Sequence, residues 1–173
     1  MLLLLLGIAV LVVGYGAWTW VTDLGMGRNQ PWQPPNPEAV HSALLRLQQS
    51  DETLLTLSVT YHDLHGFHGG LILTVHGDGR VSQEAVRVKV GPLKERVAKE
   101  DLRRLVDLLI ELSAWQQLIP DATPIPDESR ASVRISLEGH LSVIWERYND
   151  LAAGQRIIRI RELLKQIAWQ SAP

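Results

Sequence analysis

The chain begins with an apolar run that contains no charged side chain. This run, Leu2–Val21, approaches the ~20 apolar residues that a helix needs to cross a bilayer. No Lys or Arg precedes it, and Gly14-Tyr15-Gly16 within it is a poor cleavage site, so the pattern favours a retained anchor over a cleaved signal peptide, which stays the alternative. We therefore predict a single-pass membrane protein with one transmembrane helix over residues 1–22.

Two tryptophans mark where this helix should leave the bilayer. Trp18 and Trp20 close the apolar run, and indole rings prefer the membrane interface, so we expect both at the headgroups. Gly7 and Gly14 give the helix a small-residue face on which a second helix could pack. Only Arg28 follows closely, so the positive-inside rule does not fix the orientation, and we favour an extracytoplasmic domain.

Residues 23–36 form a spacer between the predicted anchor and the globular domain. Glycines stand in its first half, and prolines in its second half fix the backbone φ angle and remove amide donors. This composition predicts a flexible start and then a stiff, partly polyproline segment that holds the domain, residues 37–173, away from the membrane. A proline-rich ligand for an aromatic groove is the alternative.

The charge and the cysteine content exclude several classes of function. With 17 basic and 19 acidic residues, the net charge of −2 creates no global positive field, so we predict no nucleic-acid partner. The chain has no cysteine, which excludes disulfides, thiolate zinc sites and cysteine nucleophiles.

Hydrophobic periodicity in the first half of the domain predicts a helix and three strands. Asn36 should cap a helix from Pro37 to about Gln49. Apolar side chains then alternate along two strands, at Leu55, Leu57, Val59 and Tyr61 and again at Leu71, Leu73 and Val75. A three-residue turn with Gly79 in the left-handed region should pair Val75 with Val81.

The third strand changes the phase of its apolar residues. A bulge at residues 83–85 would explain this change, because it would put three later valines on the same face of the sheet as Val81. These valines are Val86, Val88 and Val90.

The second half predicts a helix over residues 100–118, two strands and a closing helix over residues 155–169. The strands carry their apolar residues at Val133, Ile135 and Leu137 and at Leu141, Val143 and Trp145. A three-residue turn would be needed to put both sets on one face. Hairpins separated by single helices predict an α+β fold, an antiparallel sheet of about five strands with helices on one face.

Three histidines in the stretch YHDLHGFHGG are the strongest candidates for chemistry. His62, His65 and His68 could supply the three protein ligands that a catalytic zinc requires. If residues 56–62 pair with residues 70–76, His76 lies too far along the sheet to be a fourth ligand. A glycine-rich hairpin loop, with no metal, is the interpretation we favour, and a pH-sensitive or partner-contacting loop is a further alternative.

Sequence order in the domain resembles known small domains. The segments LHGFHGGLILTVHGDGRV, EDLRRLVDLLIELSAW and RASVRISLEGHLSVIW, followed by a closing helix, resemble a class of small bacterial domains found on exported or membrane-tethered proteins. The arrangement over residues 55–169 is also similar to emfourin-type metalloprotease inhibitors. That resemblance implies a comparable α+β fold and carries over no functional residue.

These observations predict a non-enzymatic membrane protein whose domain binds another protein. The domain would act as an accessory subunit of a membrane complex or as an inhibitor, without a cofactor. We expect Trp32 and Trp169 to be exposed anchors for the partner, and the bilayer to hold the N-terminal helix. The alternatives are a metal-binding or metal-dependent hydrolase domain that uses the three histidines, and contact of the basic last helix with lipid headgroups.

Overall fold

The computed structural model describes residues 34–64, 68–118, 130–147 and 156–170. The chain divides into two units, Met1–Gln33 and Pro34–Pro173, and every described residue belongs to the second unit. The predicted anchor with Trp18 and Trp20, most of the spacer, and Trp32 all lie outside the described residues. Among the helices in the described ranges, none is long and apolar enough to cross a bilayer.

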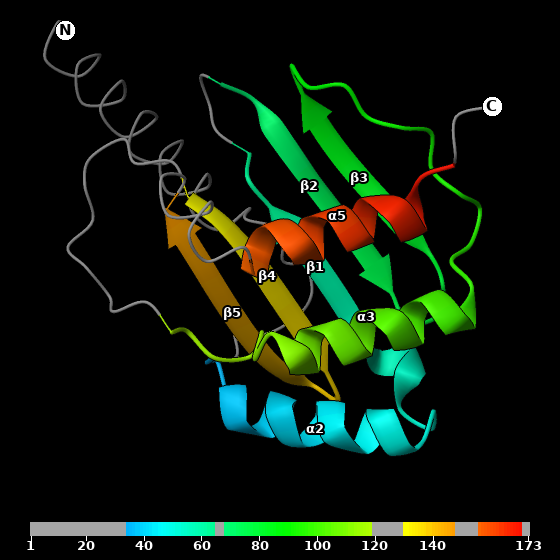
Figure 1. Ribbon diagram of the computed structural model, residues 1–173, viewed down its shortest axis with the longest axis vertical. Helices are drawn as coiled ribbons and strands as arrows, with labels where there is room; N and C mark the ends of the chain where they lie inside the picture. The colour runs from blue at the N-terminus through cyan, green and yellow to red at the C-terminus, as the bar shows by residue number, and fades with distance from the viewer. Residues whose placement is uncertain (1–33, 65–67, 119–129, 148–155, 171–173) are drawn as a thin grey trace, which may run out of the picture. The chain divides into compact units, whose positions relative to one another are not determined.

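Five strands form one antiparallel sheet (Figure 1). In chain order they are β1 Ser58–His62, β2 Gly70–His76, β3 Val81–Val86, β4 Arg130–Leu137 and β5 His140–Arg147. Their order across the sheet is β3-β2-β1-β4-β5, and all four pairings are antiparallel. The central strand is therefore β1, and the edges are β3 and β5.

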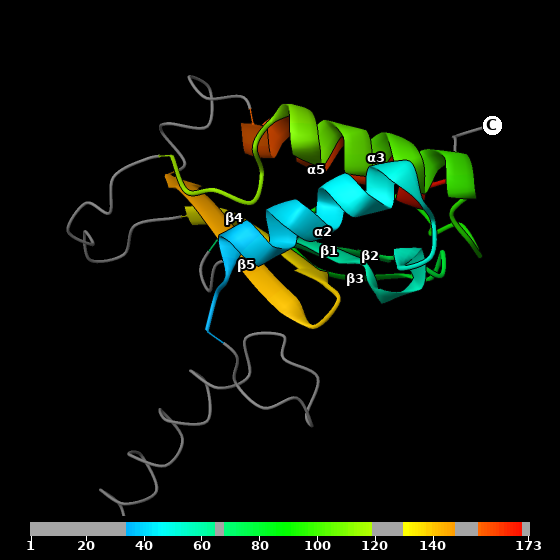
Figure 2. The ribbon, with the colours of Figure 1, turned by 90° about the horizontal axis from the view of Figure 1, so that it is seen from below.

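Three helices cover one face of this sheet (Figure 2). They are α2 Pro37–Gln49, α3 Lys99–Glu111 and α5 Arg156–Ala168. The core lies between the two layers, because each helix buries an apolar stripe and the strands bury alternate side chains. The structure confirms the predicted α+β fold, the five antiparallel strands and the order of the elements.

The start of α2 has the predicted cap. The Ala39 N–H donates to Asn36 Oδ1 at 3.1 Å, and Pro37 occupies the first turn, where a missing amide costs no hydrogen bond. The Asn36 N–H donates to Leu141 O at 2.7 Å. The cap residue therefore also attaches the helix to the edge strand β5.

The central helix α3 ends at Glu111, so the prediction of a helix to residue 118 is wrong. Ser113 adopts a left-handed φ of 49°, and the Ala114 N–H donates back to Leu109 O at 2.9 Å. This turn closes the helix and brings Ala114 and Trp115 into the core, where both are buried. The apolar residues after Glu111 fit a helical period, and only their contacts with other elements show that they belong to a turn.

The first strand starts later than its alternation predicted. Leu54–Thr56 form a 3-10 turn, η1, so Leu54 is buried and Leu55 is 73% exposed. The prediction that Leu55 faces the core is therefore wrong. In a 3-10 turn of about three residues per turn, the side chain of Leu55 points to solvent. In a strand, the same residue would share the inward face of Leu57.

This late start changes the register of β1 against β2 by two residues. His62 lies opposite Ile72, and His76 lies opposite Ser58, where Thr56 was expected. A shift of two leaves every side chain on its predicted face, because the side-chain period of a strand is two. Tyr61 thus keeps its predicted inward position and is fully buried.

β3 pairs with β2 without interruption, so the predicted bulge is absent. The register runs from Val75 opposite Val81 to Gly70 opposite Val86, and Gly79 has the expected left-handed φ of 86°. Without a bulge, Val86 stays on the opposite face from Val81 and is 39% exposed. The change in apolar parity after Val81 therefore reflects exposed valines and not a bulge.

β5 is one residue out of phase with its prediction, because the turn before it has two residues. Leu137 pairs with His140, and the loop residues Glu138 and Gly139 have φ of 51° and 77°. Two successive left-handed residues make a type I′ turn, whose twist matches that of the strands. The residues of β5 that face the core and are buried are Ser142, Ile144 and Glu146, in place of the predicted Leu141, Val143 and Trp145.

We expect Gly139→Ala to lower the free energy of unfolding by about 1–2 kcal/mol, because an alanine is strained in the left-handed region. A Cβ at this position would meet no atom within 4 Å, so steric exclusion does not contribute. Gly139→Asn is the matched control, because Asn tolerates this region, and it should cost clearly less. Chemical denaturation followed by tryptophan fluorescence would measure both, and equal losses would contradict the assigned turn.

The ion pairs of Asp51 predict a pH dependence of stability. Asp51 accepts hydrogen bonds from Arg103 and Lys99, with Oδ2 to Lys99 Nζ at 2.7 Å, and these hold its pKa below the ordinary 3.8, at about 2. A lowered pKa stabilises the folded state above 3.8, and the stabilisation disappears as the pH falls towards about 2. We expect Asp51→Asn to be less stable than the unchanged chain near neutral pH, and the difference to shrink as the pH falls through about 2. Denaturant unfolding across this range would test it, with Glu52→Gln as the control, and a difference that does not change with pH would refute it.

Candidate functional site

A buried tyrosine and an aspartate fix the start of the histidine loop. The Tyr61 hydroxyl donates to Asp63 Oδ2 at 2.6 Å, and the Leu71 N–H donates to Asp63 Oδ1 at 2.6 Å. The Asp63 N–H returns a hydrogen bond to Leu71 O at 3.0 Å. Burial, together with the hydrogen bond to Asp63, raises the pKa of Tyr61 above its usual value, so the phenol stays protonated and keeps donating. Asp63 therefore holds both ends of the β1–β2 hairpin together.

The three candidate metal ligands are only partly described. His62 ends β1 and is half-buried on the face of the sheet opposite the helices, and His68 is exposed in the turn before β2. His65 lies outside the described residues. Within the described ranges, no group of three or more His, Asp or Glu side chains could hold a metal ion. The zinc site on this loop stays a prediction.

Trp169 is held by contacts within the domain. Its indole N–H donates to Gln83 Oε1 at 3.0 Å, its backbone bridges to Leu93, and its ring lies against Gly91. The Lys165 ammonium stands 5.5 Å from the centre of the ring. Trp169 is therefore a half-buried clamp between α5 and the β3–α3 connection, whereas the sequence predicted an exposed side chain. Its role in binding a partner stays a prediction.

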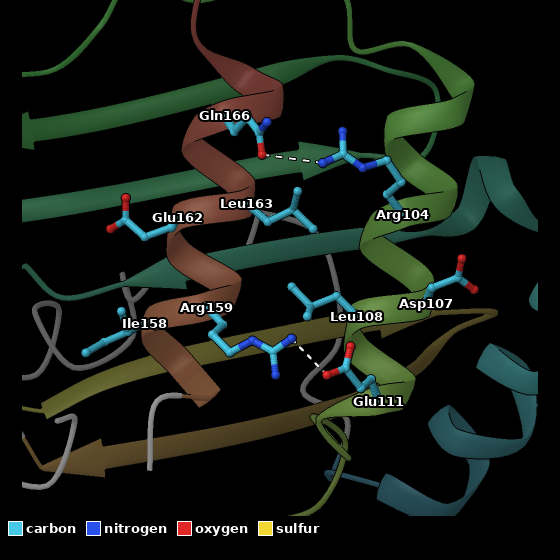
Figure 3. A pocket seen from close by; sticks show the side chains of 9 residues that line it. All are labelled: Arg104, Asp107, Leu108, Glu111, Ile158, Arg159, Glu162, Leu163 and Gln166. Atoms are coloured by element: carbon cyan, nitrogen blue, oxygen red, sulfur yellow. Dashed lines mark hydrogen bonds and ion pairs between the residues drawn. The ribbon is translucent and has the colours of Figure 1, made fainter. Parts of the chain in front are cut away.

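A groove runs between α3 and α5 on the outer side of the helical layer (Figure 3). Leu108 and Leu163 face each other across it. Two contacts bridge it, from Arg159 Nη2 to Glu111 Oε1 at 2.8 Å and from Arg104 Nη2 to Gln166 Oε1 at 3.5 Å. The groove is thus spanned by its own side chains, which a ligand would have to displace.

The basic residues of α5 are also largely engaged within the domain. Arg161 and Lys165 both lie within ion-pair distance of Glu162, and Arg159 pairs with Glu111. Arg156 donates to the carbonyl oxygens of Leu112, Ser113 and Gln116 at 2.7–3.0 Å. Contact of this helix with lipid headgroups stays a prediction, and it would compete with these pairs.

One edge of the sheet is closed by other parts of the chain. The side-chain amide of Gln117 accepts from the Trp145 N–H and donates to Trp145 O, both at 2.9 Å, as a neighbouring strand would. Farther along β5, the carbonyl of Leu141 accepts the Asn36 N–H. Such contacts are a recognised way to protect an edge strand from pairing with other chains.

The other edge is flanked by the β3–α3 connection, in which Gly91 O accepts from the Gln83 side-chain amide at 3.3 Å and the Val97 N–H donates to Gly79 O at 2.9 Å. The His76 N–H donates to Arg80 O at 2.9 Å, so the backbone groups of Arg80 face β2. Backbone groups of an antiparallel strand point alternately toward and away from its neighbour, so those of Val81, Gln83 and Ala85 point away from β2. The outward backbone groups of β3 have no backbone partner among the described residues.

Three exposed valines continue from this edge. Val86, Val88 and Val90 are 39%, 42% and 37% exposed, and we call them the valine strip. They end β3 and begin the connection to α3, which is drawn in green along the β3 side of the sheet (Figure 1). The predicted bulge would have placed the strip on the same face as the earlier apolar residues, although its alternation with Arg87 and Lys89 is also typical of an exposed segment.

Comparisons of the chain with protein-family models, with curated proteins and with solved structures found no match. The similarity to emfourin-type inhibitors therefore stays a prediction, and the candidate surface is defined by its geometry alone.

Proposed function

We propose that the chain is a non-enzymatic, single-pass membrane protein whose α+β domain binds another protein at the β3 edge and the valine strip. The N-terminal apolar run would hold the domain at the bilayer, and the partner would be a subunit of a membrane complex or an enzyme that the domain inhibits. The proposal needs no cofactor and assigns no catalytic residue.

The observation that carries the proposal is the difference between the two edges of the sheet. β5 is closed by Gln117 and Asn36, whereas β3 keeps outward backbone groups without a described backbone partner and continues into the valine strip. Exposed edge strands with apolar side chains pair readily with other chains, so proteins usually protect them. Because β3 keeps these groups while the opposite edge strand β5 is closed, we infer that a partner binds by adding a strand to β3.

The proposal predicts site-specific crosslinking to a protein. A photo-reactive amino acid at position 88 of the full chain, activated in the native membrane, should form an adduct with one protein that mass spectrometry identifies. The same amino acid at position 55 is the matched control, because Leu55 is also an exposed apolar residue but lies on η1, away from the valine strip. The adduct should form at position 88 and be absent at position 55.

A second variant tests whether the valines themselves contribute. Val86→Thr with Val90→Thr keeps the shape and the β-branching of both side chains but replaces a methyl group by a hydroxyl group. We expect the adduct at position 88 to decrease several-fold, because each threonine loses roughly 1 kcal/mol of apolar burial. If no protein is crosslinked at position 88, or if positions 88 and 55 give the same adducts, the proposed site is wrong.

A further inference from the structure

The segment that carries the valine strip differs in charge from the rest of the chain. From Val86 to Arg96 it contains four basic residues and one acidic residue, Glu95, whereas the whole chain has 17 basic and 19 acidic residues. Lys89 is exposed within the valine strip and is not ion-paired with another residue in the part of the chain that the structure describes, whereas Arg96 lies against Gly79 at the β2–β3 turn. This side of the domain therefore offers a cation to a partner, although the chain as a whole is acidic.

The backbone of the same segment is also available. β3 ends at Val86, opposite Gly70, so β2 offers no pairing beyond that point. The backbone groups of Val88, Lys89 and Val90 have no hydrogen bond to another described residue. The next attachments follow directly, where Gly91 O accepts from the Gln83 side-chain amide at 3.3 Å and Pro92 O accepts the Gln170 N–H at 2.9 Å. Residues 88–90 thus present unpaired amides, valine side chains and positive charge together.

We propose that the partner contributes an extended, acidic segment that lies as an added strand along residues 86–90. Its backbone would pair with residues 88–90, its apolar side chains would cover the valine strip, and its carboxylates would face Lys89. This inference rests on the proposed function and specifies the chemistry of the partner. Strand addition obtains its affinity from main-chain hydrogen bonds and its selectivity from alternate side chains.

An anionic membrane surface would also attract this charge, but it fits the backbone less well. Burying residues 88–90 among acyl chains would leave their amide and carbonyl groups without hydrogen bonds, at several kcal/mol for each unsatisfied group. A peptide strand satisfies the same groups while it covers the valines. The observations therefore favour a protein segment over lipid.

The test uses the full chain with the photo-reactive amino acid at position 88, in the native membrane. Three forms are compared, namely the unchanged background, Lys89→Gln and Lys89→Glu. We expect the adduct to decrease in the glutamine form and to fall by about tenfold or more in the glutamate form, because like charges across an interface repel strongly. Peptide mapping of the adduct should identify a segment rich in Asp and Glu.

A fourth form gives an effect of the opposite sign. Glu95→Lys removes the only acidic side chain between Val86 and Arg96, and it should increase the adduct at low salt. This increase should shrink as added salt shortens the range of the interaction. A gain of the same mapped adduct that disappears with added salt separates a charge effect from a structural one, because misfolding would give different adducts.

The outcomes distinguish the inference from the proposed function. A protein adduct at position 88 that keeps its yield in the glutamate form, or that maps to a basic or neutral segment, overturns the acidic partner and leaves the proposed function standing. Adducts with lipid alone, or no protein adduct in any form, overturn both. An acidic segment together with the expected order of yields supports both.

Discussion

The turn that follows α3 holds the helical layer and the edge of the sheet together. Its direction is set at Ser113, which is in the left-handed region, and the guanidinium of Arg156 on α5 donates to three carbonyl oxygens of residues 112–116. These are carbonyl groups at and beyond the end of a helix, which lack intrahelical partners and require such donors. One side chain of α5 therefore fixes the path by which the chain leaves α3.

That path brings the following residues into contact with two further elements. Trp115 stacks on His41 of α2 with ring centroids 3.9 Å apart, and its carbonyl accepts the Ser142 hydroxyl of β5. Two residues later, Gln117 pairs with the backbone of Trp145 and closes the β5 edge. All three helices and β5 thus meet at one short turn, whereas the outward backbone groups of the other edge strand, β3, have no backbone partner among the described residues.

Much of the architecture could be predicted from the sequence. Asn36 and Pro37 mark the start of α2, the spacing of isoleucines and leucines marks α5, and Gly79 marks the turn that pairs Val75 with Val81. These signals are local, because each depends on residues within a few positions of one another. The candidate site was missed for the opposite reason, since periodicity shows that alternate valines share a side of an extended segment but not whether anything covers them.

Sequence alone determined the class of the fold, the number and order of its strands and helices, and the inward face of β1, β2 and β4. It did so because apolar side chains must alternate in a half-buried strand and recur every three to four residues in a helix. Tertiary structure decided where α3 ends, which face of β5 is buried and which edge of the sheet stays open. Leu141, Val143 and Trp145 are as apolar as a core requires, yet the two-residue turn at Glu138 and Gly139 and the partners of Ser142 placed the alternate set inside. A local pattern does not contain these contacts, because they join residues that are distant in the chain.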